Sequence, residues 1–322
     1  MSEILLNVDD LSIVYKTAAG EVRAVNNISF AIEKGKTLGL VGETGAGKTT
    51  TALGILRLLP ARTAEYRSGT VTFEGQNLLT LSDKEMYGLR GRKISMVFQD
   101  PMTALNPIMN VNDQIAEAIQ FHSDGTLKRE EVDKRVDDIL ELVGIPASRK
   151  KEYPHQFSGG MKQRIVIAIA LVCEPALLIA DEPTSALDVT MQAQVLAMIM
   201  ELKKKINTSM LMISHDLGVI ARTCDEVAVM YAGEIIEMAP TDMIFTGERH
   251  HPYTVGLMNS LPGVSGNAKR LKPIEGMMPD PTDLPAGCKF APRCPFCEER
   301  CKIELPPCTE QNGHLVRCHR FA

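Results

Sequence analysis

The amino-acid sequence predicts an α/β protein with a mostly parallel core sheet, and three observations carry this prediction. The apolar pattern switches repeatedly between strand-like and helix-like over about the first 240 residues. A glycine-rich turn at residues 42–49 joins a short apolar strand to a helix, as in phosphate-binding loops. Ten of the 18 prolines lie at or beyond Pro252, and six of the eight cysteines lie between Cys288 and Cys318, which indicates a different, loop-rich end of the chain.

Length and composition fit this organisation. A chain of 322 residues that is 44% hydrophobic and 23% charged can bury one large core and add a smaller part. We place the boundary near Pro240 to His250. This leaves one domain over residues 1–240 and a cysteine- and proline-rich C-terminal extension over residues 241–322, expected as loops rather than as continued helix and strand.

Composition also bears on location and partners. The longest apolar stretch, Ile165–Cys173, is much shorter than the roughly 20 residues that cross a bilayer, so we expect no transmembrane helix. The first residues, MSEILLNVDD, carry acids where a signal peptide would be basic, which favours a cytoplasmic protein. A net charge of −5 gives no general attraction to nucleic acid, so we expect no nucleic-acid partner.

The elements around the glycine-rich turn can be placed from their apolar periodicity. Three segments have the pattern of strands, one has that of a helix, and one resembles the arm of a hairpin. In chain order they are the strands 4–16, 28–33 and 37–42, the helix 51–59 and the hairpin arm 71–78.

Strands and helices continue to alternate in the rest of the first domain, as is typical of a mostly parallel sheet. Two amphipathic helices between Val111 and Val143, separated by the polar segment FHSDGT, indicate a helical insertion over about residues 100–165. The other predicted elements are the strand 94–99, a helix from about Met161, the strand 176–181, the helix 192–205, the strand 210–214 and a strand pair over 227–238.

The glycine-rich turn matches the P-loop pattern in its required context between a strand and a helix. Glycines let backbone N–H groups face phosphate oxygens, Lys48 reaches the outer phosphates, and Thr49 offers a hydroxyl to Mg²⁺. The alternative is a turn that only opens a helix, and the spacing together with the Lys-Thr pair favours phosphate binding. The predicted nucleotide-binding residues of this loop are Gly42, Glu43, Thr44, Gly45, Ala46, Gly47, Lys48, Thr49 and Thr50.

A second segment that contains candidate catalytic residues is the apolar strand that ends in Asp181 and Glu182. Acidic residues can end a strand simply as turn residues. Phosphate hydrolysis, however, requires a carboxylate for Mg²⁺ and a second carboxylate for the attacking water. Because a P-loop is present, we interpret Asp181 as a Mg²⁺ ligand and Glu182 as the catalytic base.

The segment FSGGMKQR, residues 157–164, resembles the signature motif of ABC ATPases. In that family the serine and glycines of the motif, usually LSGGQ, open a helix whose N-terminus holds the γ-phosphate of ATP bound to the opposite subunit. Ser158, Gly159 and Gly160 match the motif. Phe157 and Met161 depart from its commonest form, which indicates a particular branch of the family.

The resemblance to ABC ATPases implies further site residues, which occur in the family order over about the first 240 residues. Tyr15 matches the aromatic ring that stacks on adenine. Gln99 matches the glutamine that senses Mg²⁺ and the attacking water. Asp188 ends the segment SALD, which crosses between subunits, and His215 matches the histidine that contacts the γ-phosphate. The implied fold adds an antiparallel β subdomain and a helical subdomain to the core sheet.

The resemblance also implies a working unit of two ATPase subunits. ATP with Mg²⁺ held by Tyr15, Lys48 and Thr49 of one subunit would be capped by Ser158 and Gly160 of another. Because both halves of the composite site are present here, the sequence leaves open whether the partner is a second copy or a related chain.

The end of the chain resembles the C-terminal extension of ATPase subunits from oligopeptide, dipeptide and nickel importers. The matching segments are HPYTVGLMNSLP from His251, then PIEGMMPD, then PAGCKFAPRC. This resemblance implies a second, different ATPase subunit, two membrane permeases and an extracellular solute-binding protein. It places the chain on the cytoplasmic face of the membrane and favours peptide over nickel or sugar as the solute.

The clustered cysteines predict a metal site, because a cytosolic chain keeps its thiols reduced rather than paired in disulfides. Four thiolates suit either zinc or an iron–sulfur cluster. The gaps are wider and less equal than in zinc knuckles, which favours a [4Fe–4S] cluster over Zn²⁺, with free cysteines as a further alternative. The importer resemblance implies the ligands Cys288, Cys294, Cys301 and Cys318, and leaves Cys297 and Cys308 as spare thiols.

Two other classes of function compete with a transport ATPase. An ABC ATPase that acts on nucleic acid in repair or translation could use clustered cysteines as zinc modules, but such chains commonly carry two cassettes and this one has a single P-loop. A module that senses ATP without turnover would not need Glu182 and His215, which are both present.

Overall fold

The computed structural model of the chain describes residues 3–18, 20–123, 126–260 and 273–322. Its residues group into two compact units. Unit 1 comprises Met1–Leu5, Glu33–Lys36 and Thr80–Met212, and unit 2 comprises Leu6–Ile32, Thr37–Leu79 and Ile213–Ala322. In the part of the chain that the structure describes, no helix has both the length and the apolar character that crossing a membrane requires.

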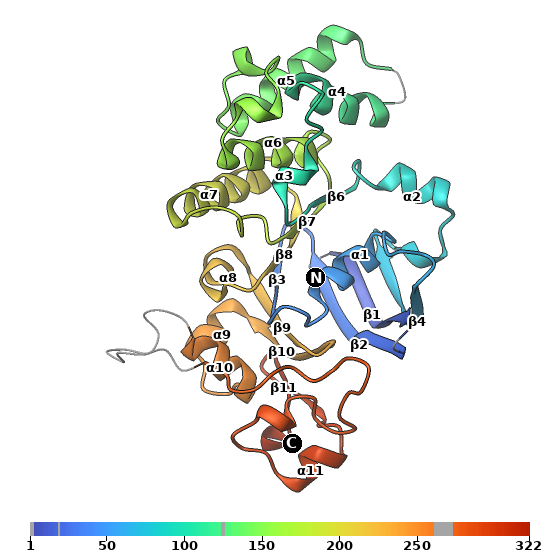
Figure 1. The fold of residues 1–322 in the computed structure, drawn as a ribbon, viewed down its shortest axis with the longest axis vertical. Coiled ribbons are helices and arrows are strands. Elements are labelled where there is room, and N and C mark those ends of the chain that lie inside the picture. Colours follow the sequence, from blue (N-terminus) through green and yellow to red (C-terminus); the bar gives the residue numbers. More distant parts are fainter. Residues whose placement is uncertain (1–2, 19, 124–125, 261–272) are drawn as a thin grey trace. The chain divides into compact units, whose positions relative to one another are not determined.

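Unit 1 consists of a group of helices and a small set of parallel strands (Figure 1). Strands β6 and β7 pair in parallel, with Ile94 opposite Leu177, and β8 lies next to β7. The elements are α2 Asp83–Leu89, β6 Ile94–Val97, α3 Pro101–Ala104, α4 Val111–His122, α5 Arg129–Leu142, η2 Ala147–Arg149, η3 Pro154–Gln156, α6 Gly159–Leu171, β7 Leu177–Asp181, α7 Val189–Ile206 and β8 Ser209–Ser214, which ends in unit 2.

The helices of unit 1 begin where capping side chains supply acceptors to their first N–H groups. Asn110 caps α4 by accepting a hydrogen bond from the N–H of Asp113 at 2.9 Å. The two helices expected between Val111 and Val143 are confirmed as α4 and α5, and residues 124–125 of the expected linker lie outside the described residues. Helix α6 is buried on several sides, as its apolar run predicts.

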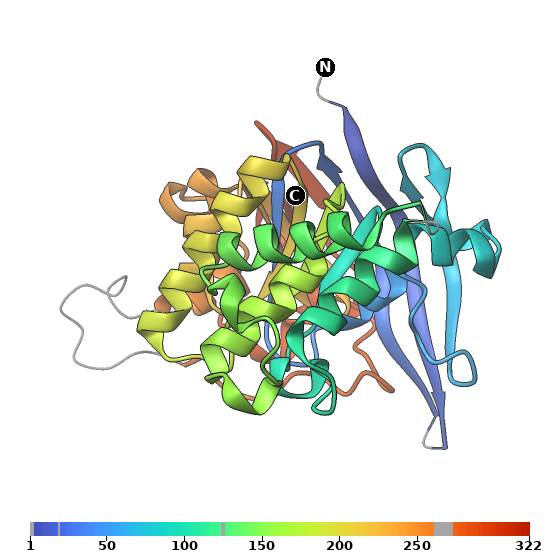
Figure 2. The ribbon, with the colours of Figure 1, turned by 90° about the horizontal axis from the view of Figure 1, so that it is seen from above.

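Unit 2 contains a four-stranded antiparallel sheet in the order β2-β1-β4-β5 (Figure 2). Its strands are β1 Ile4–Thr17, which begins in unit 1, β2 Gly20–Glu33, β4 Ala64–Phe73 and β5 Gln76–Asn77. Strand β2 starts at Gly20, eight positions before the expected start at residue 28. Its first half, GEVRAVN, mixes polar and apolar residues and is partly exposed, and it forms a strand through cross-strand pairing that apolar periodicity does not reveal.

The remaining strands of unit 2 form one sheet in the order β11-β12-β10-β9-β3. Strand β3 pairs in parallel with β9, whereas β10 pairs antiparallel with both β9 and β12. The elements are η1 Leu78–Thr80 at the unit boundary, β3 Thr37–Val41, α1 Lys48–Ile55, α8 Leu217–Thr223, β9 Glu226–Tyr231, β10 Glu234–Pro240, α9 Thr241–Thr246, α10 Pro252–Asn259, η4 Ala291–Arg293, α11 Glu299–Ile303, β11 Cys308–Gln311, β12 His314–Arg317 and η5 His319–Phe321.

The C-terminal extension differs from the expected run of loops, because its strands β11 and β12 continue the sheet of β9 and β10. It also has an aromatic core. The rings of Tyr231, Tyr253 and Phe290 are almost fully buried, with centroids 4.6 to 5.5 Å apart. Packing of this kind joins α10 and the segment before η4 to strand β9, and it places the extension in the unit that holds the glycine-rich loop.

Candidate functional site

The glycine-rich loop of unit 2 runs from the end of β3 to the start of α1, and two of its glycines are required by close backbone approach. A Cβ on Gly42 would lie 2.1 Å from the carbonyl oxygen of Met230. A Cβ on Gly47 would lie 2.4 Å from the carbonyl oxygen of Ala24, and its φ of 106° is left-handed. A side chain at either position would therefore require the backbone to move.

Lys48 lies inside this loop and is only 5% exposed. Its ammonium donates to the carbonyl oxygens of Gly42 at 2.7 Å and Glu43 at 3.0 Å. Thr49 follows at the start of α1 and is exposed, whereas the next residue, Thr50, accepts a hydrogen bond from the Tyr15 hydroxyl at 3.4 Å. The structure thus brings Tyr15, on β1, to the first turn of the helix that the loop opens.

In unit 1, strand β7 delivers two carboxylates to its C-terminal end. Asp181 is the last residue of the strand and is 2% exposed. Glu182 follows with a φ of 46°, in the left-handed region that a residue with a side chain rarely adopts. The side-chain amide of Gln99, just beyond β6, donates to Oε2 of Glu182 at 3.0 Å. Gln99 and Glu182, predicted separately from the sequence, therefore lie together.

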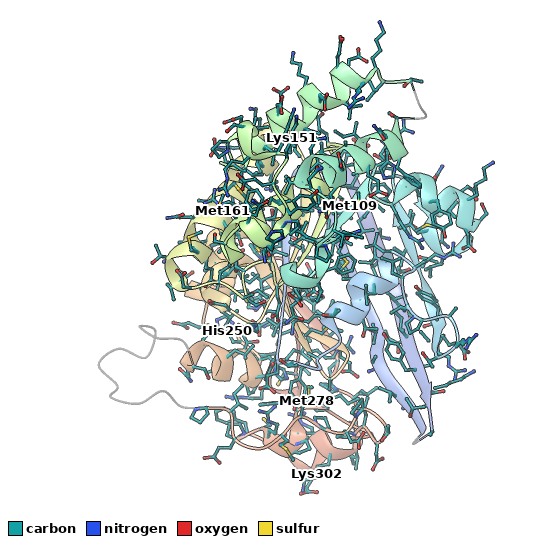
Figure 3. All side chains as sticks on the ribbon, turned by 45° about the horizontal axis from the view of Figure 1, so that its top comes forward. Met109, Lys151, Met161, His250, Met278 and Lys302 are labelled. Atoms are coloured by element: carbon teal, nitrogen blue, oxygen red, sulfur yellow. The ribbon has the colours of Figure 1, made fainter. Side chains whose placement is uncertain are left out.

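The signature segment of unit 1 lies at the start of α6, near Met161 among the helices (Figure 3). Ser158 caps the helix by accepting from the N–H of Met161 at 3.4 Å, and both Ser158 and Gly159 are exposed. A Cβ on Gly160 would lie 2.5 Å from Cε of Met191, on α7. Two helix N-termini meet here, because Asp188 caps α7 by accepting from the N–H of Met191 at 3.0 Å.

The residues predicted to bind nucleotide are divided between the two units. Unit 2 holds the glycine-rich loop, Tyr15 and His215, which is exposed just after β8. Unit 1 holds the carboxylates, Gln99 and the signature segment. An exposed helix N-terminus, as at Ser158 and Gly159, is suited to bind an anion such as phosphate.

The four cysteines predicted as metal ligands line one narrow cavity in the extension; they are Cys288, Cys294, Cys301 and Cys318. Among the described residues that line this cavity, neither Cys297 nor Cys308 occurs. The backbone holds two of the four together, because the N–H of Cys288 donates to the carbonyl oxygen of Cys301 at 2.8 Å.

The electrostatics of this cavity suit a cation. Burial is the main cause that raises the pKa of the Cys288 thiol to about 12; the backbone N–H of Phe290 opposes this rise, and the neighbouring sulfurs of Cys318, Cys294 and Cys301 add to it. Burial also raises the pKa of Cys294 and Cys318. Thiolates are therefore costly here without a positive partner, and a bound metal would supply one. The donor set fits a metal group.

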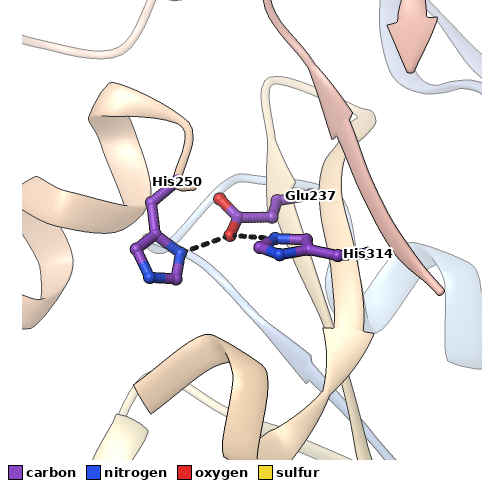
Figure 4. A group of neighbouring side chains, drawn as sticks. All are labelled: Glu237, His250 and His314. Carbon is purple, nitrogen blue, oxygen red and sulfur yellow. Dashed lines mark hydrogen bonds and ion pairs between the residues drawn. The ribbon is translucent and has the colours of Figure 1, made fainter. Parts of the chain in front are cut away.

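Sequence reasoning missed a buried polar cluster of Glu237, His250 and His314 in the same unit (Figure 4). Oε1 of Glu237 bonds Nδ1 of His250 at 2.7 Å and Nε2 of His314 at 2.9 Å. Its Oε2 accepts from the N–H of His251 at 2.8 Å and from the hydroxyl of Thr254 at 2.6 Å. No local pattern could have indicated this cluster, because His314 lies 77 positions from Glu237 along the chain.

Hydrogen bonds connect the side chains of this cluster. The three side chains offer ligand atoms within 4.8 Å of one another, but hydrogen bonds within the cluster already occupy them. Burial alone would raise the pKa of Glu237, yet the donors from His250, His314, Thr254 and His251 lower it to about 2. The carboxylate thus stays charged and ties β10 to β12 and to the start of α10.

Two family models match the chain. The ABC transporter model matches residues 25–185, and the model of the oligopeptide/dipeptide transporter C-terminal region matches residues 236–301. The chain is 48% identical over 319 residues to the dipeptide transport ATP-binding protein DppD of Bacillus subtilis, and the match covers 98% of this chain and 94% of the relative. It is 50% identical over 306 residues to the oligopeptide transport ATP-binding protein OppD of the same organism, covering 94% and 85%.

Solved structures share the fold. CbiO1 from Clostridium perfringens, part of the ABC transporter complex cbiONQ, is 29% identical with a TM-score of 0.66, covering 76% of this chain and 91% of that one. The ATP-binding cassette MJ0796, solved as a dimer bound to ADP and phosphate, has a TM-score of 0.66 at 24% identity, covering 73% and 98%. The predicted α/β class with a cassette core is confirmed.

Proposed function

The chain belongs to the ABC transporter family as an ATP-hydrolysing subunit, and from this premise we propose that it powers the import of peptides. The observation that carries the proposal is the presence, in one chain, of a cassette and of the C-terminal region found in oligopeptide and dipeptide transporters. Its place would be the cytoplasmic face of the membrane, as a peripheral subunit beside two permeases, with an extracellular binding protein that delivers the solute.

The proposed roles of the site residues follow from their chemistry. The backbone N–H groups of residues 42–49 and the Lys48 ammonium would hold the phosphates, with Tyr15 against the adenine. Mg²⁺, when bound, offsets phosphate charge, and Thr49, Gln99 and Asp181 are its proposed ligands. Support for a base comes from Glu182, whose carboxylate the Gln99 amide orients at 3.0 Å and which would take the proton of the attacking water. His215 would contact the γ-phosphate.

We propose that the complete site forms between two ATPase subunits, with a different partner chain favoured over a second copy. The N-terminus of α6 at Ser158, Gly159 and Gly160, of which Ser158 and Gly159 are exposed, would cap the nucleotide of the partner together with Asp188 at the start of α7. The purified chain is then expected to be mostly monomeric and a slow ATPase. Sedimentation and phosphate release test this, and a stable nucleotide-free homodimer with fast turnover contradicts it.

Transport in proteoliposomes tests the solute. The chain would be assembled with the permeases, second ATPase and binding protein encoded beside its gene, and supplied with ATP inside the vesicles. Uptake of a labelled dipeptide or longer peptide that stops with the Lys48→Ala variant is the expected result. Nickel or sugar uptake without peptide uptake overturns the peptide proposal and leaves the transport ATPase in place.

We further propose that Cys288, Cys294, Cys301 and Cys318 hold a [4Fe–4S] cluster that stabilises the extension. Their common cavity supports this ligand set. The distances between the cysteine sulfurs support an iron–sulfur cluster over zinc. A tetrahedral zinc site with Zn–S bonds of about 2.3 Å places its sulfurs about 3.8 Å apart. Within the described chain, no three cysteine sulfurs lie within 4.8 Å of one another.

Anaerobic purification tests the cluster. We expect iron and labile sulfide in about a four-to-one ratio to protein for a [4Fe–4S] group, lost in Cys301→Ser. Cys308→Ser is the matched control, because Cys308 is exposed and outside the cavity, and it should keep its iron. Stoichiometric zinc without iron rejects the cluster, and iron retained in Cys301→Ser rejects this ligand set.

A further inference from the structure

Arg293, in the C-terminal extension, bonds the glycine-rich loop although 250 residues separate it from Glu43. It is almost fully buried, and its guanidinium donates to both carboxylate oxygens of Glu43, at 2.8 Å and 3.1 Å. The remaining donors are also used: they reach the carbonyl oxygens of Glu275 at 3.0 Å and Ile274 at 3.3 Å, and the Tyr231 hydroxyl at 3.4 Å. A bidentate pair with every donor engaged has one defined orientation.

Other residues of the extension hold the same loop. The N–H of Glu43 donates to the Tyr253 hydroxyl at 2.9 Å, and Tyr253 lies on α10. A Cβ on Gly45 would lie 3.0 Å from Cε of Met278, a residue of the extension that is labelled in Figure 3. The extension therefore holds Glu43 of the loop through two side chains, Arg293 at its carboxylate and Tyr253 at its backbone N–H.

These contacts bear on phosphate binding in two ways. Glu43 places a negative charge inside a loop that holds negative phosphates, and an unpaired carboxylate there would repel them. The pairing with Arg293 neutralises that charge and turns the carboxylate toward the extension. In addition, the carbonyl oxygen of Glu43 accepts from Lys48, so a fixed Glu43 also fixes the lysine that reaches the phosphates.

We propose that Arg293 is a positioning residue for nucleotide binding, which acts from the C-terminal extension by neutralising Glu43 and holding the glycine-rich loop in its phosphate-binding conformation. The proposal rests on the proposed role of residues 42–49 in holding ATP. It gives the extension a function in the ATPase itself, beyond any contact with transport partners.

The test measures the affinity of the full chain for Mg²⁺-ATP by calorimetry. The unfolding temperature and the iron content of each variant are measured as well. Arg293→Ala is expected to weaken binding about tenfold or more, the scale of a lost charge-assisted hydrogen bond. Adding Glu43→Gln to Arg293→Ala should restore most of the affinity, because no charge is then left to repel phosphate. Arg293→Lys keeps the charge without the bidentate geometry and should lie between wild type and Arg293→Ala.

Arg249→Ala is the matched control. Arg249 is a part-buried arginine of the extension that donates to the carbonyl oxygens of His314 at 2.7 Å and Thr309 at 3.2 Å, away from the loop. It should lower the unfolding temperature and leave ATP affinity near wild type. Equal losses in both arginine variants, no loss in Arg293→Ala, or no rescue by Glu43→Gln each overturn the proposal. If Lys48→Ala binds ATP as tightly as wild type, it is instead the proposed role of the loop that fails.

Discussion

Two glutamates in different regions of the molecule hold their carboxylates in opposite ways. Glu237, on β10 in unit 2, is fully buried and accepts from His250, His314, Thr254 and the backbone of His251. Glu182, after β7 in unit 1, is only partly buried, has a left-handed backbone and bonds the neutral amide of Gln99. The first is stabilised as an anion on both oxygens, and the second remains accessible to a reacting molecule.

The surroundings of the two carboxylates distinguish one that serves a structural role from one that is available to react. A carboxylate surrounded by donors has a lowered pKa and little capacity to take up a proton at neutral pH. A carboxylate on strained backbone beside a neutral amide is held in position without being neutralised by a cation in that contact. Substitutions at the two positions should therefore affect different quantities.

The largest effect is expected for Glu182→Gln, which should reduce ATP turnover by about 10²–10⁴-fold, the range for a lost general base. ATP binding and the unfolding temperature should stay close to wild type, because the glutamine keeps the shape of the side chain. Phosphate release by the assembled transporter measures turnover, and nucleotide affinity serves as the control. Wild-type turnover in this variant would show that Glu182 is not the base.

Glu237→Ala should instead act on stability. Removing the common acceptor leaves four donors in the interior without it, and breaking a buried ion pair of this kind costs about 3–5 kcal/mol. Chemical denaturation of the chain measures the free energy of unfolding. Glu310→Ala, an exposed glutamate on β11 of the same sheet, is the control and should change it by less than about 0.5 kcal/mol. Equal, small losses in both variants contradict the structural role.

A change of pH should have a smaller effect on stability, and the sign of this effect follows from the pKa values of His250, His251 and Glu237. The Glu237 carboxylate raises the pKa of His250, so its contribution to stability is full below 6.5 and is lost as pH rises through the folded-state pKa. Burial lowers the pKa of His251 to about 4, so its contribution is full above 6.5 and is lost as pH falls toward 4. Glu237, with a pKa of about 2, loses its contribution as pH falls from 4.5 toward 2.

These three dependences predict maximal stability of the cluster near pH 6.5. Unfolding temperatures across the pH range measure it in wild type and in Glu237→Gln. The decline above pH 6.5 should disappear in the variant, because His250 loses its anionic partner, while the decline below 6.5 due to His251 should stay. A decline above 6.5 that persists unchanged in Glu237→Gln would assign it to another group.

Much of the fold could be predicted because its signals are local. The paired helices α4 and α5, the strands β3 and β7 and the turn into α1 each follow from the apolar period and from neighbouring residues. The first half of β2 and the strands β11 and β12 could not be predicted this way. Strands β11 and β12 are short, and the first half of β2 mixes polar and apolar residues; these segments form strands because a partner strand supplies their hydrogen bonds.

Sequence patterns alone identified the candidate site residues that lie close together along the chain. Gly42, Gly47 and Lys48 are positioned by the backbone of one loop, and Ser158 by the helix that it caps. Such chemistry depends on spacing within a few residues, so a pattern of letters suffices to predict it.

Contacts between residues that lie far apart in the sequence could be identified only from the tertiary structure. The pairing of Glu43 with Arg293 and the position of Glu237 between His250 and His314 join segments up to 250 residues apart. No local pattern specifies these contacts, because a buried charge accepts any donor that the fold brings within reach. The choice is made when β10, β12 and α10 pack into one core, where an unpartnered charge would be too costly to keep.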